Sequence, residues 1–473
     1  MENFLEYARQ HYYNAGSLTL GETLAMARGL GCRVSDVVLM EAAVSQRMSP
    51  GEVRQAVLRS FEHNLVAAEF GLRDGHSFLL GKVPSELAAN QFQQRLAADD
   101  FINKVLVYTL GAQVGNHWCG LQPCAGTGDS CTYTGLFRAF AEMLEDQEEL
   151  ARIAAVILKV GTLFRAGKST TGCNMEGFGA GAAATAAALV EWRQGTPDMM
   201  ENAMVLSLSP TIANPCTPRV MVPGLCATHI GGGVVIGNLA ANLALCTSIP
   251  VNVPIDVMLA MAADAHKASA AAIVPVVNRY MQPFFKTNPE VEDFIPSGVK
   301  NAEAEAVDTT VAAALQEAKE LARKANPIVR PFGDAVVGGS SQAVGSPTNT
   351  GRIAHFLAAG QITGVDIELY PELFARRGIN VPGILMGAVL GAGTDDKEAY
   401  ARVIGMVREN KISVAVRQVD QPQLQRVTVR ATERNAMVEA LNRGGARLVL
   451  KNASPSLREA ENIAQRLGIV LAD

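Results

Sequence analysis

The chain has 473 residues, of which 48% are hydrophobic and 18% are charged, and its formal net charge is −5. This length is enough for two or three domains with buried cores, and the composition is that of a soluble, alanine-rich globular protein. The small negative charge and the lack of a long basic run argue against nucleic acid or an anionic membrane surface as a main partner.

The start of the chain and its most apolar segment predict a cytoplasmic protein. The opening sequence MENFLEYARQHYY is charged and has no apolar run typical of a secretory signal. The segment from Val234 to Val251 is interrupted by Asn238, Asn242 and Ser248, which favours a buried helix over a membrane span. In the cytoplasm the eight cysteines are not expected to form a disulfide framework.

Residues 1–325 are predicted to form one large, mainly α domain. Ser49, Pro50 and Glu52 have the pattern of a capping box with proline at the first helical position, and apolar residues at helical spacing follow them. This domain shows little alternation of apolar and polar residues, so few strands are expected. The charged, alanine-rich stretch 301–326 predicts a last helix that connects the domain to the next one.

Residues 328–473 are predicted to form a smaller α/β (α+β) domain. Short β-branched runs predict strands, and two stretches that each end in glycine predict helices. The strands are expected at 365–370, 412–419, 425–432 and 446–452, and the helices at 435–445 and 454–468.

Two sets of three cysteines are candidates for a metal centre. The compact set is Cys119, Cys124 and Cys131, and the dispersed set is Cys173, Cys216 and Cys226. Neither set has the C-x2-C spacing of the strongest zinc or ferredoxin motifs. Glycines around Cys173 allow close approach of backbone amides, and prolines on both sides of Cys216 fix its direction. The local chemistry therefore favours the dispersed set, with inert buried thiols as the alternative.

The dispersed set resembles a motif of the iron–sulfur L-serine dehydratase family. The matching residues are Gly172-Cys173 with Glu176, Cys216-Thr217-Pro218, and Val222-Pro223 ahead of Cys226. Residues 1–290 resemble the α part of such enzymes, and GSPTNTGRIAHFLAAG resembles the substrate loop of the β part, which follows the α part here. The resemblance implies that Cys173, Cys216 and Cys226 hold a [4Fe–4S] cluster whose fourth iron stays open as a Lewis acid.

The resemblance also implies where a substrate would bind. The glycine-rich loop of the first domain and the loop of the second are expected to meet it, in a site between the domains. The predicted substrate-binding residues are Ala125, Gly126, Thr127, Gly128, Ser130, Ser346, Thr348, Asn349 and Thr350. Asn349 stands where the family usually has histidine, and this departure leaves the identity of the substrate open.

Three residues are candidates for proton transfer and charge balance. His63 and His229 are predicted as base or orienting groups, because imidazole titrates near neutral pH, and Lys168 as a balancing charge. The alternative for each histidine is a hydrogen-bonded helix residue, and for Lys168 a solvated side chain.

The resemblance predicts a lyase that removes water, and then ammonia, from a small β-hydroxy amino acid such as L-serine. A cysteine desulfidase with the same cluster and a non-catalytic, cluster-bearing sensor remain as alternatives. We expect a homodimer that binds a small amino-acid-like substrate, and neither nucleic acid nor a membrane as partner.

Overall fold

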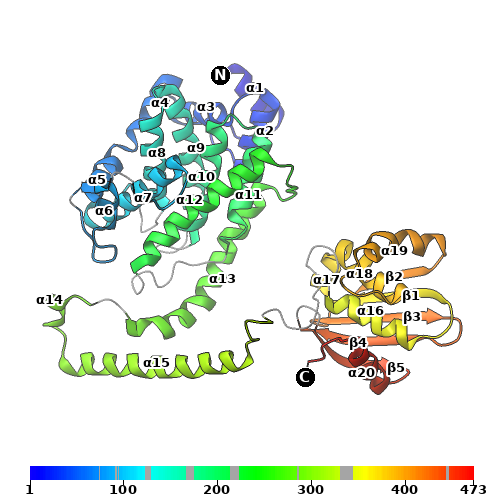
Figure 1. Cartoon of the computed structure of the whole chain (residues 1–473). Coiled ribbons are helices and arrows are strands. Elements are labelled where there is room, and N and C mark those ends of the chain that lie inside the picture. Colours follow the sequence, from blue (N-terminus) through cyan, green and yellow to red (C-terminus); the bar gives the residue numbers. More distant parts are fainter. Residues whose placement is uncertain are drawn as a thin grey trace. The chain divides into compact units, whose positions relative to one another are not determined.

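The computed structural model of the chain (Figure 1) describes residues 1–473 except for 74, 91–92, 94, 123–128, 167–174, 213–222, 285–286, 331–344, 444–446 and 473. The side chains of 129, 165–166, 175–178, 223–226, 266–267, 269–270, 274 and 282 also lie outside the described part. The chain divides into two compact units, Met1–Gln316 and Glu317–Asp473. The observed division falls inside helix α15, whereas the sequence pattern changes at 325–328.

The first unit is mainly helical, as predicted, and its described residues contain one isolated β-bridge, Ser77 with Gly81, and no longer strand. Its helices are α1 (Glu2–Gln10), α2 (Leu20–Leu30), α3 (Val34–Gln46), α4 (Pro50–Arg59), α5 (Glu62–Arg73), α6 (Val83–Ala89), α7 (Asp100–Cys119), α8 (Asp129–Met143), α9 (Gln147–Ala166), α10 (Met175–Trp192), α11 (Pro197–Leu208), α12 (Pro223–Cys246), α13 (Ile255–Met281), η1 (Gln282–Phe284), α14 (Pro289–Glu292) and α15 (Ser297–Lys324).

The helix starts follow from local side-chain chemistry. The Ser49 hydroxyl accepts a hydrogen bond from the Glu52 amide, and the Glu52 carboxylate accepts one from the Ser49 amide. This reciprocal pair satisfies amides that a helix start would leave unpaired, so the predicted capping box is confirmed. The hydroxyl of Thr196 caps α11 in a similar way, accepting from the amide of Met199.

Close packing of small residues holds the centre of the first unit together. Helix α10 is buried along its middle, where the seven alanines from Ala180 to Ala188 have no exposed surface. Helix α12 packs against it so closely that a Cβ on Gly237 would lie 2.5 Å from the Ala182 carbonyl oxygen. Small side chains let helix backbones approach closely, so the alanine- and glycine-rich sequence determines the helix spacing here.

Helix α12 contains the most apolar described segment. The stretch Ala227–Cys246 has 20 residues and a mean hydropathy of 1.4, which by length and composition would suit a membrane span, and 44% of its most apolar window is buried. Val235 and Leu239 are 50% and 57% exposed. The helix predicted to be buried is thus buried on one face only.

The contact between α5 and α7 offers a test of this packing. A Cβ on Gly115 would lie 2.0 Å from the Ala67 carbonyl oxygen, whereas one on Gly51 in α4 meets nothing within 4 Å. Alanine favours a helix over glycine by about 1 kcal/mol, so Gly51→Ala should be neutral or stabilising. Gly115→Ala should instead lower the free energy of unfolding by about 2 kcal/mol, because the backbones must separate. Urea unfolding measures both, and equal effects of the two substitutions would contradict the packing argument.

The second unit is a small α/β unit with a mixed five-stranded sheet. The strands lie in the order β2-β1-β3-β4-β5; β1 and β2 are parallel, and the other neighbours are antiparallel. Helix α16 packs against β3 and β4, α20 against β5, and α18 against α16 and β1. The elements are α16 (Gly345–Leu357), β1 (Ile362–Leu369), α17 (Pro371–Ala375), α18 (Arg377–Leu390), α19 (Lys397–Glu409), β2 (Ser413–Gln418), β3 (Leu424–Ala431), β4 (Ala436–Asn442), β5 (Leu448–Ser454) and α20 (Leu457–Arg466).

One predicted helix of the second unit is wrong. Residues 435–445 were expected to be helical, but Ala436–Asn442 form strand β4, which pairs with β3 on one side and β5 on the other. Ala436, Val438 and Ala440 are buried, while the residues between them are only half-buried. Pairing on both edges and burial of alternate residues override the helix propensity of alanine, methionine, glutamate and leucine. The predicted helix at 454–468 is confirmed as α20.

Candidate active site

The helix ends that flank several predicted site segments lie together at one end of the first unit's bundle. Helices α8 and α10 run parallel, because a Cβ on Gly181 would lie 3.0 Å from the Thr132 hydroxyl oxygen near their starts, and the Phe140 and Trp192 rings meet near their ends, 5.8 Å between centroids. Their first turns therefore lie side by side. Segment 123–128 precedes α8, and segment 167–174 precedes α10.

Helix α12 joins this arrangement in parallel with α10. Gly237 packs against Ala182, and further along the same direction the Arg193 guanidinium donates a hydrogen bond to the Asn242 side-chain oxygen. The common direction places the first turn of α12, which contains Cys226, beside the start of α10. The start of α10 follows Cys173 by two residues.

The end of α11 reaches the same place from the opposite direction. A Cβ on Gly179 in the second turn of α10 would lie 3.3 Å from the Thr211 hydroxyl oxygen, just after α11 ends. The described residues on either side of segment 213–222 therefore lie close to the start of α10. The segments that carry Cys173, Cys216 and Cys226 are thus all flanked by described residues at one end of the bundle.

A cavity of about 330 Å³, which the sequence pattern does not predict, lies at this end. Its walls are mainly apolar and include Phe164, Gly179 and Leu208. Asp256 also lines it, but its carboxylate accepts hydrogen bonds from the Thr19 hydroxyl at 2.6 Å and the Gly21 amide at 3.0 Å. Asp256 therefore holds the start of α2, and the cavity offers an apolar volume beside the candidate site.

His63 and Asn64 hold the chain just ahead of the glycine-rich segment. The Asn64 amide group donates to the Gln122 carbonyl oxygen, and its oxygen accepts from the Gln122 amide at 2.7 Å. His63 Nε2 lies 2.9 Å from the Gly120 carbonyl oxygen. A carbonyl only accepts, so Nε2 carries the proton and donates it. This contact favours a role for His63 in positioning the segment before 123–128.

Sequence reasoning missed a hydrogen-bonded group beside that segment. The fully buried Cys131 thiol donates to Gln113 Oε1 at 3.0 Å, and Gln113 Nε2 donates to His117 Nε2 at 2.8 Å. Although part of the His117 side chain is exposed, the protein packed around it lowers its pKa. The imidazole is therefore favoured in its neutral form. The i,i+4 spacing of Gln113 and His117 was the available signal.

Ser130 and His229 are the other predicted residues of the first unit whose side chains the structure describes. Ser130 lies in the first turn of α8 with no exposed surface, and within the described part of the chain its hydroxyl has no hydrogen-bond partner. A buried hydroxyl without a partner is costly, so a bound ligand is one way to satisfy it. His229 is half-buried on α12, one turn beyond Cys226.

The predicted residues of the second unit lie in a helix rather than a loop. Ser346, Thr348, Asn349 and Thr350 occupy the first turns of α16 and are all buried. Gln425 Nε2 on β3 lies 2.8 Å from both the Ser346 and the Thr350 hydroxyl oxygens. The Thr348 hydroxyl has no partner among the described residues. The packing of α16 against β3 therefore fixes the positions of these four polar side chains. That they contact a substrate stays a prediction.

The remaining predicted site residues lie outside the described part of the chain. Cys226 is described in its backbone alone, and in the described side chains no group of three or more His, Cys, Asp or Glu residues is placed to hold a metal ion. The undescribed residues are Ala125, Gly126, Thr127, Gly128, Lys168, Cys173 and Cys216.

No protein-family model and no curated protein matches this chain. By its fold, the protein consists of two units, a large helical bundle followed by a small α/β unit with a mixed sheet. The likeness to iron–sulfur L-serine dehydratases therefore rests on the sequence motifs.

Proposed function

We propose that this protein is a [4Fe–4S]-dependent lyase that removes water, and then ammonia, from a small β-hydroxy amino acid such as L-serine. The observation that supports the proposal most is the parallel packing of α8, α10 and α12. It places the first turns of these helices together; Cys226 lies in the first turn of α12, and in the sequence Cys173 stands two residues before α10 and Cys216 between α11 and α12.

The residues at this end of the bundle suit such a cofactor. Cys173, Cys216 and Cys226 would hold it, because three thiolates are a donor set typical of iron–sulfur clusters. The starts of α8, α10 and α12 present backbone amides and the positive ends of helix dipoles, which favour a negatively charged cluster or carboxylate. The small residues of α10 keep these helix starts close together.

Residues of this chain would bind the substrate, position the backbone around it and remove its Cα proton. When bound, a cluster with one iron free of protein ligands supplies a Lewis acid for the departing hydroxide. The amides of 125–128 and the Ser130 hydroxyl bind the substrate carboxylate or amino group. His63 keeps the preceding backbone in place through Gly120, and His229 is the candidate that removes the Cα proton. Loss of that proton and of hydroxide leaves aminoacrylate, which tautomerises and hydrolyses to a keto acid and ammonia.

The proposal is tested by the products of the anaerobically purified protein. We expect iron and inorganic sulfide in a ratio near one, and pyruvate formed from L-serine without added pyridoxal phosphate. Sulfide released from L-cysteine, with no pyruvate from serine, would instead favour the desulfidase. A full cluster with neither product would favour the sensor, and a colourless protein without bound iron would contradict all three.

A further inference from the structure

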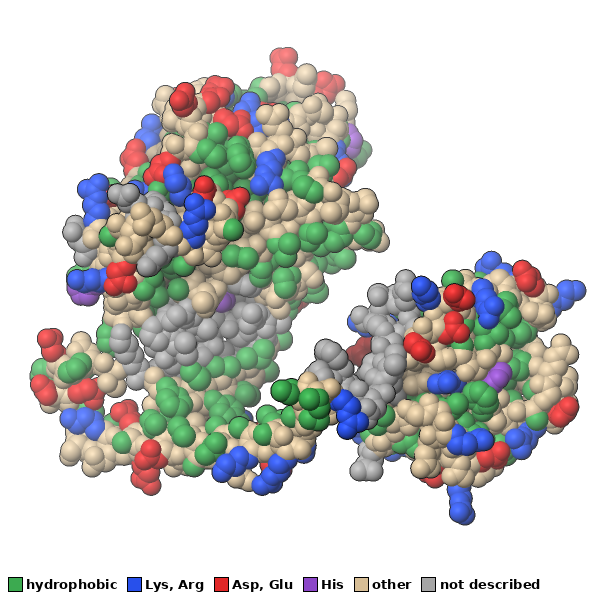
Figure 2. Space-filling model, in the orientation of Figure 1, with side chains coloured by type: hydrophobic (Ala, Val, Ile, Leu, Met, Phe, Trp, Pro, Cys, Tyr) green, Lys and Arg blue, Asp and Glu red, His purple; other side chains and the backbone are tan. Residues whose placement is uncertain are grey.

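Helix α15 is a long helix that packs little against the rest of the described chain. It has 28 residues, none of them buried, and Val311, Leu315 and Leu321 are 48%, 52% and 61% exposed. Figure 2 shows hydrophobic side chains between charged ones along the segment that Figure 1 labels α15. Helices in proteins gain most of their stability from packing an apolar face, so we expect the apolar face of this helix to pack against a partner.

The sequence of α15 contains the seam of a coiled coil. Its small and apolar residues recur alternately three and four positions apart, the spacing that places them in one stripe. The stripe is Ala304, Val307, Val311, Ala314, Ala318 and Leu321, which we call the α15 seam. Its first half faces a hollow of about 450 Å³ between α15 and the end of α13, lined by Arg279, Pro283 and Thr287 on the α13 side. From Val311 to Leu321 the seam residues are exposed, so this part of the seam is open to a further helix.

The described residues from 345 onward offer no exposed apolar strip as long as this seam. A helix of 28 residues is about 42 Å long. Among the described residues from 345 onward, the large apolar side chains that are exposed are Phe356, Leu457, Val470 and Leu471, none above 44%. These few side chains do not make a strip of that length.

We propose that α15 pairs with α15 of a second copy of this chain, in antiparallel orientation. In that arrangement the seam is self-complementary, since Val311 lies opposite Ala314 of the second copy, and Val307 lies opposite its Ala318. The larger side chains then meet alanines throughout the seam. Because the pairing is two-fold symmetric, each contact occurs twice, as a closed dimer requires.

The charges beside the seam favour the antiparallel orientation. Glu303 and Lys324 occupy equivalent heptad positions and lie opposite each other across an antiparallel pair, twice by symmetry. A parallel pair would instead bring Glu303 near Asp308 of the other copy, and like charges there would repel. The acidic first half of α15 thus matches its basic end.

Sedimentation velocity of the full-length protein tests the pairing. The wild-type chain should sediment as a dimer with twice the chain mass of 50.1 kDa. Val311→Glu, which places a carboxylate in the seam, should give a monomer with unchanged helical content by circular dichroism. A wild-type monomer, or a Val311→Glu protein that dimerises as strongly as the wild type, would overturn the proposal.

A charge exchange tests the orientation. Glu303→Lys and Lys324→Glu alone should each raise the dimer dissociation constant about tenfold, since two symmetric attractions become repulsions. The double variant should return it to the wild-type value. Glu305→Lys, with the same charge change outside the seam, is the matched control and should have little effect. A double variant weaker than either single variant would overturn the antiparallel pairing.

Discussion

Cys226→Ser should remove the proposed iron–sulfur cluster and the proposed lyase activity together, whereas Cys246→Ser on the same helix should leave both intact. Cys226 lies in the first turn of α12 and Cys246 at its last residue, so about 30 Å of helix separates them. Serine is a poor ligand for iron beside cysteine thiolate, and loss of one of three ligands should release the cluster. We expect kcat/KM to fall at least about a hundredfold, because the Lewis acid is lost with it.

The measurements are iron and sulfide content per chain, visible absorbance under anaerobic conditions, and pyruvate formation. Cys173→Ser and Cys216→Ser should behave as Cys226→Ser does. Cys32, which is half-buried near the end of α2, provides a second control, and Cys32→Ser should retain the cluster. If Cys226→Ser binds as much iron as Cys246→Ser, the proposed ligand set is wrong.

Features set by neighbouring residues along the chain could be predicted from the sequence. The capping box at Ser49 and Glu52 places the start of α4, because both hydrogen bonds form within four residues. Glycine closes α20 in the same local way, since Gly468 has a φ of 68°, which favours glycine. The division into a helical unit and an α/β unit follows from many such local signals taken together.

Features set by distant partners could not be predicted. Residues 436–442 become a strand because β3 and β5 lie on either side, and neither is visible in the local helix-favouring composition. Ser346 and Thr350 belong to a buried helix because Gln425, far along the chain, supplies their hydrogen bonds. The parallel register of α8, α10 and α12 depends likewise on contacts such as Gly237 with Ala182. The sequence identifies the candidate cysteines, whereas packing determines which segments lie together.

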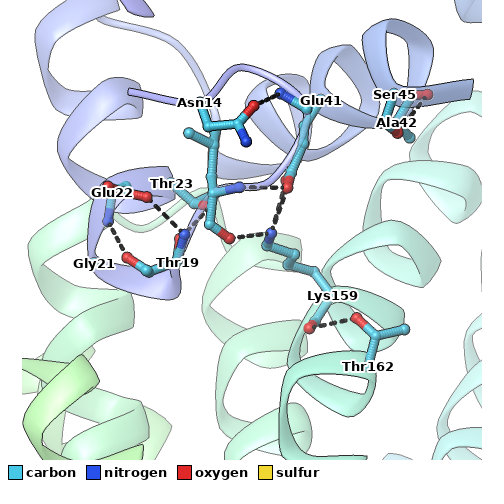
Figure 3. Close-up of polar contacts among 12 residues, drawn as sticks. Asn14, Thr19, Gly21, Glu22, Thr23, Glu41, Ala42, Ser45, Lys159 and Thr162 are labelled. Carbon is cyan, nitrogen blue, oxygen red and sulfur yellow. Dashed lines mark hydrogen bonds and ion pairs between the residues drawn. The ribbon is translucent and has the colours of Figure 1, made fainter. Parts of the chain in front are cut away.

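Removing the buried ion pair between α9 and α3 should have the largest effect on the free energy of unfolding. Lys159 Nζ lies 2.7 and 2.8 Å from the two Glu41 carboxylate oxygens and 2.7 Å from the Leu18 carbonyl oxygen (Figure 3). The Leu18 amide donates to Glu41 at 2.8 Å, so the pair fixes both backbone groups of this residue ahead of α2. The two side chains are only 10% and 11% exposed. The pair therefore joins the N-terminal segment to the bundle.

Lys159→Met should lower the free energy of unfolding of the first unit by about 3–5 kcal/mol, because it leaves the Glu41 charge buried without a partner. Adding Glu41→Gln should recover part of this loss, since a neutral amide can still accept from Leu18 and needs no cation. Lys104→Met is the matched control. Its pair with Glu142 spans 3.4 Å between side chains 43% and 38% exposed, so its loss should cost about 1 kcal/mol or less.

Urea unfolding followed by circular dichroism measures all three variants, provided that the second unit is monitored separately, for example by limited proteolysis. The order of stability of the three variants shows how much the Lys159–Glu41 pair contributes. If Lys159→Met is no less stable than Lys104→Met, the Lys159–Glu41 pair contributes no more than a surface pair. If instead the double variant is less stable than Lys159→Met alone, the stronger hydrogen bond that the charged Glu41 accepts from the Leu18 amide outweighs the cost of its unpaired charge.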